Sequence, residues 1–216
     1  MSTASTTEPK PAANASLSAS IDLERLYEIN GRCIAALVAF AKRPIHRRPV
    51  DSLATQVRDL LISLDSGAHR RAAECRFSLV DVAFSDDEWW RSVRPRPLRP
   101  SSGGVRPDCF PRRTAVSLGH SALALAWHIA SIDVGAARLF FGLSSGCAGV
   151  ISSLTLEDLE SIAHRHFHYV RPRWETRPAL WRTLLTAARA GEAKALKSFH
   201  LHAIQMLLGN AIEIGQ

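Results

Sequence analysis

The sequence is poor in cysteine, and its few cysteines are not spaced for a disulfide framework or a common zinc motif. The four cysteines lie far apart and include no CxxC pair. Disulfide scaffolds of small secreted proteins and the usual zinc sites need dense or closely paired cysteines. We therefore predict reduced, mostly buried thiols, at Cys33, Cys75, Cys109 and Cys147.

Motifs of the common enzyme classes are also missing. The chain has no Gly-rich phosphate loop, no nucleophile elbow and no pair of carboxylates at an evident cleft spacing. We therefore expect no enzymatic activity and no cofactor. His164, His166 and His168 alternate, so an extended chain would place three imidazoles on one face, as a metal site requires. Arg165 interrupts the run and no cysteine or carboxylate stands in ligand register, so we interpret these as surface histidines and predict no metal.

Long uncharged apolar runs are a third absence. Residues 1–20 are mostly Ser, Thr, Ala, Pro and Asn, with almost no large apolar side chain to offset the entropy cost of ordering, so we predict a mobile tail there. This tail has no apolar core of the signal-peptide type, and no later stretch reaches the length of an uncharged membrane span. We expect a cytoplasmic protein that has no membrane partner.

What the chain does have is apolar content and positive charge. The hydrophobic fraction of 46% is enough for a core, and the net charge of +7 favours an anionic partner such as nucleic acid. Residues 92–113 contain six arginines and five prolines, and prolines cannot continue a helix. We interpret 92–113 as a linker that divides the chain into segments 21–91 and 114–216.

These two segments resemble each other. Apolar and aromatic residues recur at a constant offset of about ninety residues, and the matching pairs are Leu64 and Leu154, Ala73 and Ala163, Phe77 and Phe167, Val80 and Val170, and Phe84 and Trp174, with Trp90 and Trp181 one residue out of step. Asp65 and Thr155 are matching helix starts, and Thr155 opens a capping-box-like sequence. We interpret this as a tandem duplication; a chance match between Leu- and Ala-rich helices is the alternative.

Helical periodicity predicts an all-α fold. The expected helices are Ile21–Arg43, Ala115–Ala130, Val134–Phe141, Ala148–Ser153, Leu156–His166, Arg177–Arg189 and Ala193–Leu208. The segments Cys75–Phe84 and His166–Trp174 are rich in β-branched and aromatic residues, so each copy is expected to contain one short strand-like segment. The five tryptophans could stack on bases, but at repeat-equivalent positions we expect packing anchors.

Two stretches carry a family resemblance. Leu26-Tyr27-Glu28-Ile29-Asn30, followed by Ile34-Ala35-Ala36-Leu37, looks like the opening helix of the FlhD-like flagellar transcriptional regulators. From Leu118 to Trp174 the second copy is similar to the same family almost without gaps. Gly142-Leu143-Ser144 resembles the family's Gly-Ile turn, and Ser153-Leu154-Thr155-Leu156 resembles its Leu-Thr-Leu helix start.

This resemblance implies two tandem FlhD-like helical domains that form a pseudo-dimer and pack through their first helices. Family members usually hold one such domain and dimerise, so here the covalent pair would replace the homodimer. The implied function is a non-enzymatic transcription activator that works with a zinc-bearing, FlhC-like partner and helps recruit RNA polymerase to flagellar or related promoters. The partner would read most of the sequence, and this chain would supply scaffold and phosphate contacts.

Two sets of residues are the candidate sites. Arginines that could contact DNA phosphates are Arg94, Arg96, Arg99, Arg112, Arg113, Arg171, Arg173 and Arg177, with a solvated surface and flexible linker as the alternative. The apolar face of the last helix would bind a partner through Leu196, Phe199, Met206 and Leu207. The alternative function is a helical adaptor or antiactivator for secretion, motility or conjugation genes that binds no DNA.

Overall fold

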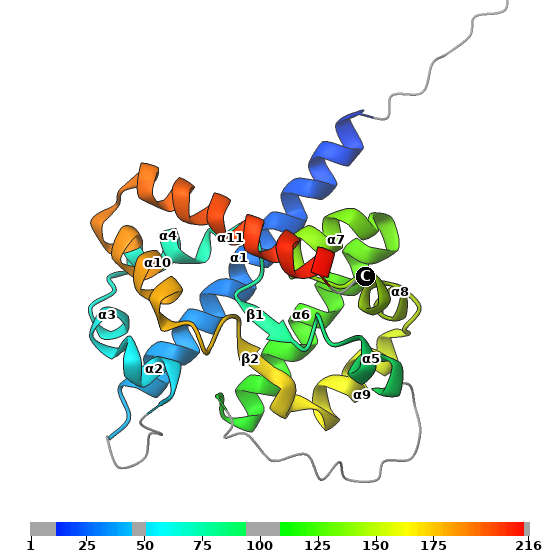
Figure 1. Ribbon diagram of the computed structural model, residues 1–216, viewed down its shortest axis with the longest axis horizontal. Helices are drawn as coiled ribbons and strands as arrows, with labels where there is room; N and C mark the ends of the chain where they lie inside the picture. The colour runs from blue at the N-terminus through cyan, green and yellow to red at the C-terminus, as the bar shows by residue number, and fades with distance from the viewer. Residues whose placement is uncertain (1–11, 45–50, 94–108, 214–216) are drawn as a thin grey trace, which may run out of the picture.

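The computed structural model describes residues 12–44, 51–93 and 109–213. These residues form the mostly helical fold that the sequence predicts, with one pair of very short strands near the centre (Figure 1). The elements are α1 (Ala12–Ala41), α2 (Leu53–Gln56), α3 (Arg58–Ile62), α4 (Ser66–Ala73), β1 (Val80–Val82), α5 (Asp87–Val93), α6 (Arg112–Ile132), α7 (Val134–Phe141), α8 (Ser145–Ser152), α9 (Leu156–Arg165), the 3₁₀ turn η2 (Phe167–Tyr169), β2 (Val170–Pro172), α10 (Pro178–Ala190) and α11 (Ala193–Glu213).

Side-chain caps set the beginnings of several helices. Asp65 accepts a hydrogen bond from the backbone N–H of Ala68 at the start of α4. Thr155 and Asp158 form a reciprocal capping box at the start of α9. Such caps satisfy backbone donors that have no partner inside the helix. The helix starts predicted at Asp65 and Thr155 are therefore confirmed, and so are the bounds predicted for α7.

Helix α6 is the central helix of the fold. It packs against α1, α7, α8 and α9 and against both strands. Among the described residues α6 alone has the length and apolar composition of a membrane span, whereas α7 and α8 pass only as a pair bent by 116°. Half of the apolar stretch of α6 is buried inside the protein, as expected for the core helix of a helical bundle.

The two strands join the first half of the chain to the second. They pair antiparallel with Val80 opposite Pro172, Asp81 opposite Arg171 and Val82 opposite Val170. Val80 and Val170 are counterparts in the sequence repeat, so the counterpart of Asp81 is Arg171. Asp81 therefore lies opposite its own counterpart. An antiparallel pair with this register has a local twofold axis.

Other features recur within one residue of the repeat offset. The indole N–H of Trp90 donates to the carbonyl of Ala83, and that of Trp181 donates to the carbonyl of Arg173. Ala83 and Trp174 have positive φ angles of 49° and 54°, a rare conformation for residues other than glycine. Trp90 and Trp181 are buried, so they are packing anchors.

Both halves contribute to one continuous hydrophobic core. Helix α5 of the first half packs against α8, and α10 of the second half packs against α3 and α4. Each half thus places a helix on the other, so neither half has a core of its own. This interlocking is what holds the elements of the candidate site in place.

The predicted bounds of the tail and of the linker are both wrong. Helix α1 begins at Ala12, so residues 12–20 of the predicted tail are helical, because several alanines there favour helix; residues 1–11 lie outside the described residues. The predicted linker is shorter than 92–113, since Ser92 and Val93 end α5 and the buried Phe110 precedes α6. The rest of the linker, 94–108, lies outside the described residues.

Candidate nucleic-acid interface

Arg173 cannot contact DNA, because its side chain is 7% exposed. Its Nε donates to the carbonyl of Ser78 at 2.7 Å, and Nη2 donates to the carbonyl of Phe141 at 2.6 Å and that of Val80 at 3.5 Å. The same nitrogen lies 3.6 Å from the carboxylate of Asp81. A buried guanidinium needs such acceptors to offset its desolvation. The prediction of a DNA contact at Arg173 is therefore wrong.

The predicted partner surface on α11 is also largely wrong. Phe199 and Leu207 are each only 4% exposed. The Phe199 ring packs against Phe77, with centroids 6.2 Å apart. Leu196 and Met206 are half-buried, and Leu196 packs against the core. The apolar face of α11 needs a partner, as amphipathic helices do, but that partner is the rest of this chain.

The other predicted arginines differ in accessibility. Arg171 is largely buried and pairs with Glu175 at 3.1 Å, which leaves little of its charge for DNA. Arg112 and Arg113 are exposed in the first turn of α6, and the Arg112 guanidinium lies 5.1 Å from the ring centre of Phe167. Arg177 is exposed at the start of α10. Outside the described residues lie Arg94, Arg96 and Arg99.

The histidine run lies partly inside an aromatic cluster. The His166 ring stacks edge-on against Trp89 at 5.5 Å, and burial lowers the pKa of His166 to about 4. His164 and His168 are exposed. Within the described ranges no three His, Cys, Asp or Glu side chains are grouped as metal ligands would be.

The cysteines are free, and Cys33, Cys75 and Cys147 are buried, as predicted. Burial raises the pKa of each of these thiols, which makes them poor nucleophiles. Cys109 is half-buried, and its thiol donates to the Glu175 carboxylate at 2.7 Å. Burial, with this carboxylate, raises the pKa of Cys109 to about 12. The Arg171 guanidinium lies 3.4 Å from the Cys109 sulfur and opposes this shift, but burial and Glu175 outweigh it, so Cys109 is also a poor nucleophile.

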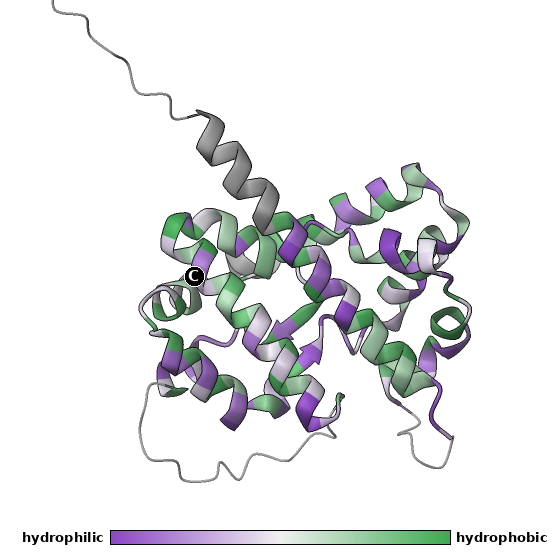
Figure 2. Cartoon of the chain, turned by 180° about the vertical axis from the view of Figure 1, so that it is seen from behind, coloured by the Kyte–Doolittle hydropathy of each residue, from purple (hydrophilic) through white to green (hydrophobic). Residues whose placement is uncertain are grey.

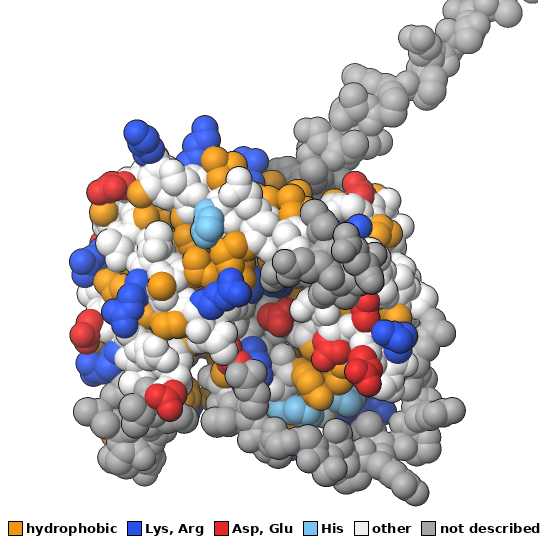
Figure 3. All heavy atoms as spheres, in the orientation of Figure 1, with side chains coloured by type: hydrophobic (Ala, Val, Ile, Leu, Met, Phe, Trp, Pro, Cys, Tyr) orange, Lys and Arg blue, Asp and Glu red, His pale blue; other side chains and the backbone are white. Residues whose placement is uncertain are grey.

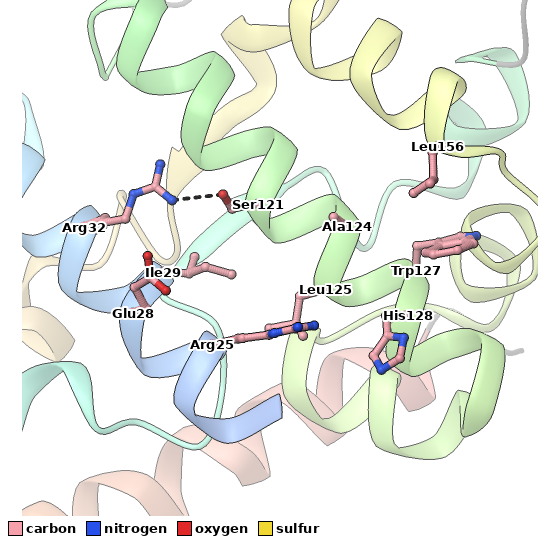
Figure 4. A pocket seen from close by; sticks show the side chains of 10 residues that line it. All are labelled: Arg25, Glu28, Ile29, Arg32, Ser121, Ala124, Leu125, Trp127, His128 and Leu156. Atoms are coloured by element: carbon pink, nitrogen blue, oxygen red, sulfur yellow. Dashed lines mark hydrogen bonds between the residues drawn. The ribbon is translucent and has the colours of Figure 1, made fainter. Parts of the chain in front are cut away.

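Two hollows in the described part of the surface lie between α1 and α6. The two helices run antiparallel: the middle of α1, from Arg25 to Arg32, lies beside the second half of α6, and the end of α1 lies beside the start of α6. Arg32 reaches across from α1 and donates to the hydroxyls of Ser117 and Ser121 on α6. Figure 2 views the molecule from this side, and Figure 4 shows the Arg32–Ser121 bond. Arg32 thus divides the groove into two hollows.

The hollow beside the start of α6 is lined by arginines, and we name it the arginine hollow. It has a volume of about 460 Å³. Among the described residues its lining contains Arg32, Arg43 and Arg113 and no acid. The small side chains of Ala35, Ala36 and Ala39 form its α1 wall. The first turn of α6 contains two arginines and no acid. Positive charge at this end of a helix is repelled by the helix dipole, so these arginines do not stabilise α6. Arginines converging here are suited to bind an anion.

The second hollow lies toward the end of α6, and we name it the tryptophan hollow. Its volume is about 320 Å³. Trp127, Leu156, Leu125, Ala124 and Ile29 supply apolar surface, as Figure 4 shows. Its polar lining comprises Arg25, Glu28, Arg32, Ser121 and His128. The two hollows therefore differ in chemistry although they share one groove.

The sequence prediction found Arg113 but missed Arg32, Arg43 and Trp127. The sequence does contain a pattern that indicates the α1 side of the groove. Arg25, Arg32 and Arg43 are spaced by about two and then three helical turns, so they share one face of the helix. Arg113 lies beside this face because α6 packs against α1, and the spacing of residues in the sequence does not reveal that packing. No protein-family model, curated protein or solved structure matches the chain.

Proposed function

We propose that this protein is a non-enzymatic transcription regulator subunit that contacts promoter DNA through the arginine hollow, in a complex with a sequence-reading, FlhC-like partner. The observation that carries the proposal is that Arg32, Arg43 and Arg113 line one hollow, with no acid among the described residues of its lining. Arginine binds phosphate through paired N–H donors and by charge, and each phosphate neutralised releases a counterion. Phosphate contacts of this kind position a protein without reading sequence.

The groove also fits the proposed tandem duplication. We infer that α1 and α6 are counterparts, because they pack antiparallel beside a strand pair whose register places Asp81 opposite Arg171. The matching caps at Asp65 and Thr155 and the matching indole bonds of Trp90 and Trp181 support the same inference. A pseudo-dimer of this kind is what the FlhD-like pattern in both halves implies, and with it an activator role at flagellar or related promoters, with RNA polymerase as a further partner.

The proposal is tested by purifying the tagged chain from its own host and footprinting the eluted complex on host DNA at two salt concentrations. We expect a second, zinc-bearing subunit and a footprint that weakens steeply as salt rises. A complex prepared with Arg43→Gln and Arg113→Gln should protect DNA less. Elution of the chain without such a subunit or RNA polymerase, combined with no footprint, would contradict the proposal.

The second candidate is an adaptor that binds protein and not DNA. The observation that favours it is the exposed apolar surface at the tryptophan hollow, where Leu156 is 64% exposed. The same footprinting separates the two candidates, because an adaptor would co-purify with a protein partner and leave the DNA unprotected. Its apolar contacts would also depend little on salt.

A further inference from the structure

Exposed apolar side chains gather at the end of α6. Of the large apolar residues that the structure shows as exposed, three lie here: Ile132 at 67%, Leu156 at 64% and Val134 at 46%. Ile132 follows His128 by one helical turn, so it continues the face that lines the tryptophan hollow. Trp127 and Leu156 supply the apolar surface of the hollow itself (Figure 4). Clustered exposed apolar surface of this kind marks an interaction site.

Charge at the hollow is uneven. The α1 side carries Arg25 and Arg32 and a single acid, Glu28. Arg32 donates to two neutral hydroxyls, forms no ion pair with an acid among the described residues, and lines the hollow with its positive charge. A partner that lies along the groove would therefore meet cations on its α1 side and apolar surface on its α6 side. Acidic side chains on one face and apolar side chains on the other would complement both.

We propose that the tryptophan hollow docks an acidic amphipathic helix of a protein partner, with one large apolar side chain placed against Trp127 and Leu156. A groove between two helices receives such a helix through anchors spaced by one helical turn, and aromatic residues dominate the binding energy. The volume of about 320 Å³ has room for one large side chain and its flanking groups. This docking does not depend on DNA binding at the arginine hollow.

The test uses synthetic helical peptides as probes and the full-length chain. One labelled peptide has leucine or phenylalanine anchors on one face and glutamates elsewhere, and a second replaces every glutamate with lysine. Fluorescence anisotropy should show binding of the acidic peptide and at least tenfold weaker binding of the basic one. Equal binding of the two peptides, or binding of neither, would overturn the proposal.

Two surface variants locate the contact without disturbing the core. Leu156→Asp adds an acid to the first turn of α9, which the helix dipole favours, so folding is retained while the acidic peptide is repelled. Leu201→Asp is the matched control, because Leu201 is 57% exposed on α11 and does not line the hollow. We expect Leu156→Asp to weaken the acidic peptide at least tenfold and Leu201→Asp to leave it unchanged. Equal effects of the two variants would overturn the proposal. It would also be overturned if the chain self-associates and Leu156→Asp abolishes that self-association, because the hollow would then bind a second copy of the chain.

Discussion

Arg173 holds three parts of the chain together through one buried side chain. It follows β2 directly, and its guanidinium bonds the carbonyls of Ser78 and Val80 in the first half and that of Phe141 at the end of α7. Burial lowers the pKa of Arg173 and the nearby Asp81 opposes that shift, yet a guanidinium stays charged at neutral pH. A methionine of similar length would leave the carbonyls without this donor.

We therefore predict that Arg173→Met lowers the free energy of unfolding by about 3 kcal/mol, the scale of losing two charge-assisted hydrogen bonds. Arg177→Met is the control, because Arg177 is exposed, and its effect should stay within about 0.5 kcal/mol. Guanidinium chloride titration followed by circular dichroism measures both. Equal stabilities of the two variants would show that Arg173 is not a structural residue.

Asp87 connects α5 to the start of α8. Its carboxylate accepts hydrogen bonds from the Ser144 hydroxyl and from the backbone N–H of Cys147 at 3.1 Å. The bond from Ser144 is the largest cause that holds the pKa of Asp87 below its ordinary value of 3.8. The carboxylate thus acts as a cap for α8 that comes from a different helix.

Acid should weaken this cap. Because folding lowers the pKa of Asp87, its contribution to stability is complete above the ordinary value, which holds in the unfolded chain, and is lost as pH falls through the lower folded value. We predict that Asp87→Asn lowers the free energy of unfolding by about 1 kcal/mol at pH 7 and that this difference shrinks below about pH 4. Thermal unfolding from pH 7 down to pH 3 measures it, with Glu88→Gln, an exposed neighbour, as control. A difference that stays constant down to pH 3 would contradict this account of Asp87.

At the scale of elements, a glycine sets how closely α6 approaches β2. A Cβ added to Gly119 would lie 2.7 Å from Cγ2 of Val170, closer than real Cβ contacts allow. Gly149, in α8, is also helical, yet a Cβ there would meet nothing within 4 Å. Alanine at Gly149 therefore tests helix propensity alone, whereas alanine at Gly119 also tests the packing of α6 against β2.

We predict opposite effects for two identical substitutions. Gly149→Ala should raise the free energy of unfolding by about 0.5 to 1 kcal/mol, because alanine is the better helix former. Gly119→Ala should lower it by about 1 to 3 kcal/mol, because α6 and β2 must move apart. Chemical denaturation of both variants gives the signs, and stabilisation by Gly119→Ala would mean that α6 and β2 are less tightly packed than described.

How far the elements could be predicted depended on local signals. The bounds of α7 were predictable because Asp133 caps its start and Gly142, with φ of 61°, ends it. The start of α8 predicted at Ala148 is wrong, because the Ser144 side chain caps the helix and it begins at Ser145. The burial of Arg173 was not predictable, since β-strand pairing and the end of α7 supply its acceptors from distant parts of the chain. The arginine hollow likewise depends on the antiparallel packing of α1 on α6.

At the scale of the molecule, one core spans both halves. We predict a single cooperative unfolding transition, in which circular dichroism and tryptophan fluorescence change together. Leu61→Ala in the first half and Leu159→Ala in the second remove fully buried side chains, so each should lower the midpoint of that same transition. Two separate transitions, with each variant shifting only one, would show that the halves fold independently.

Charge is distributed unevenly over the surface. Figure 3 shows Lys and Arg side chains over α10 and α11, and Asp and Glu side chains gathered over α5. The exposed Lys194 and Lys197 on α11 therefore offer a second basic surface against which the arginine hollow can be compared. Net charge attracts DNA at both surfaces, whereas the arginines of the hollow converge on one space.

The central claim, that the arginine hollow binds nucleic-acid phosphate, is tested most directly by the salt dependence of binding to a short labelled duplex, measured by anisotropy. The chain with Arg43→Gln and Arg113→Gln is compared with the chain carrying Lys194→Gln and Lys197→Gln, which removes the same charge from α11. We predict that the first pair weakens binding and reduces the slope of log affinity against log salt by about one per arginine, and that the second pair has little effect. Equal loss in both variants, or no binding by the parent chain at low salt, would contradict the claim.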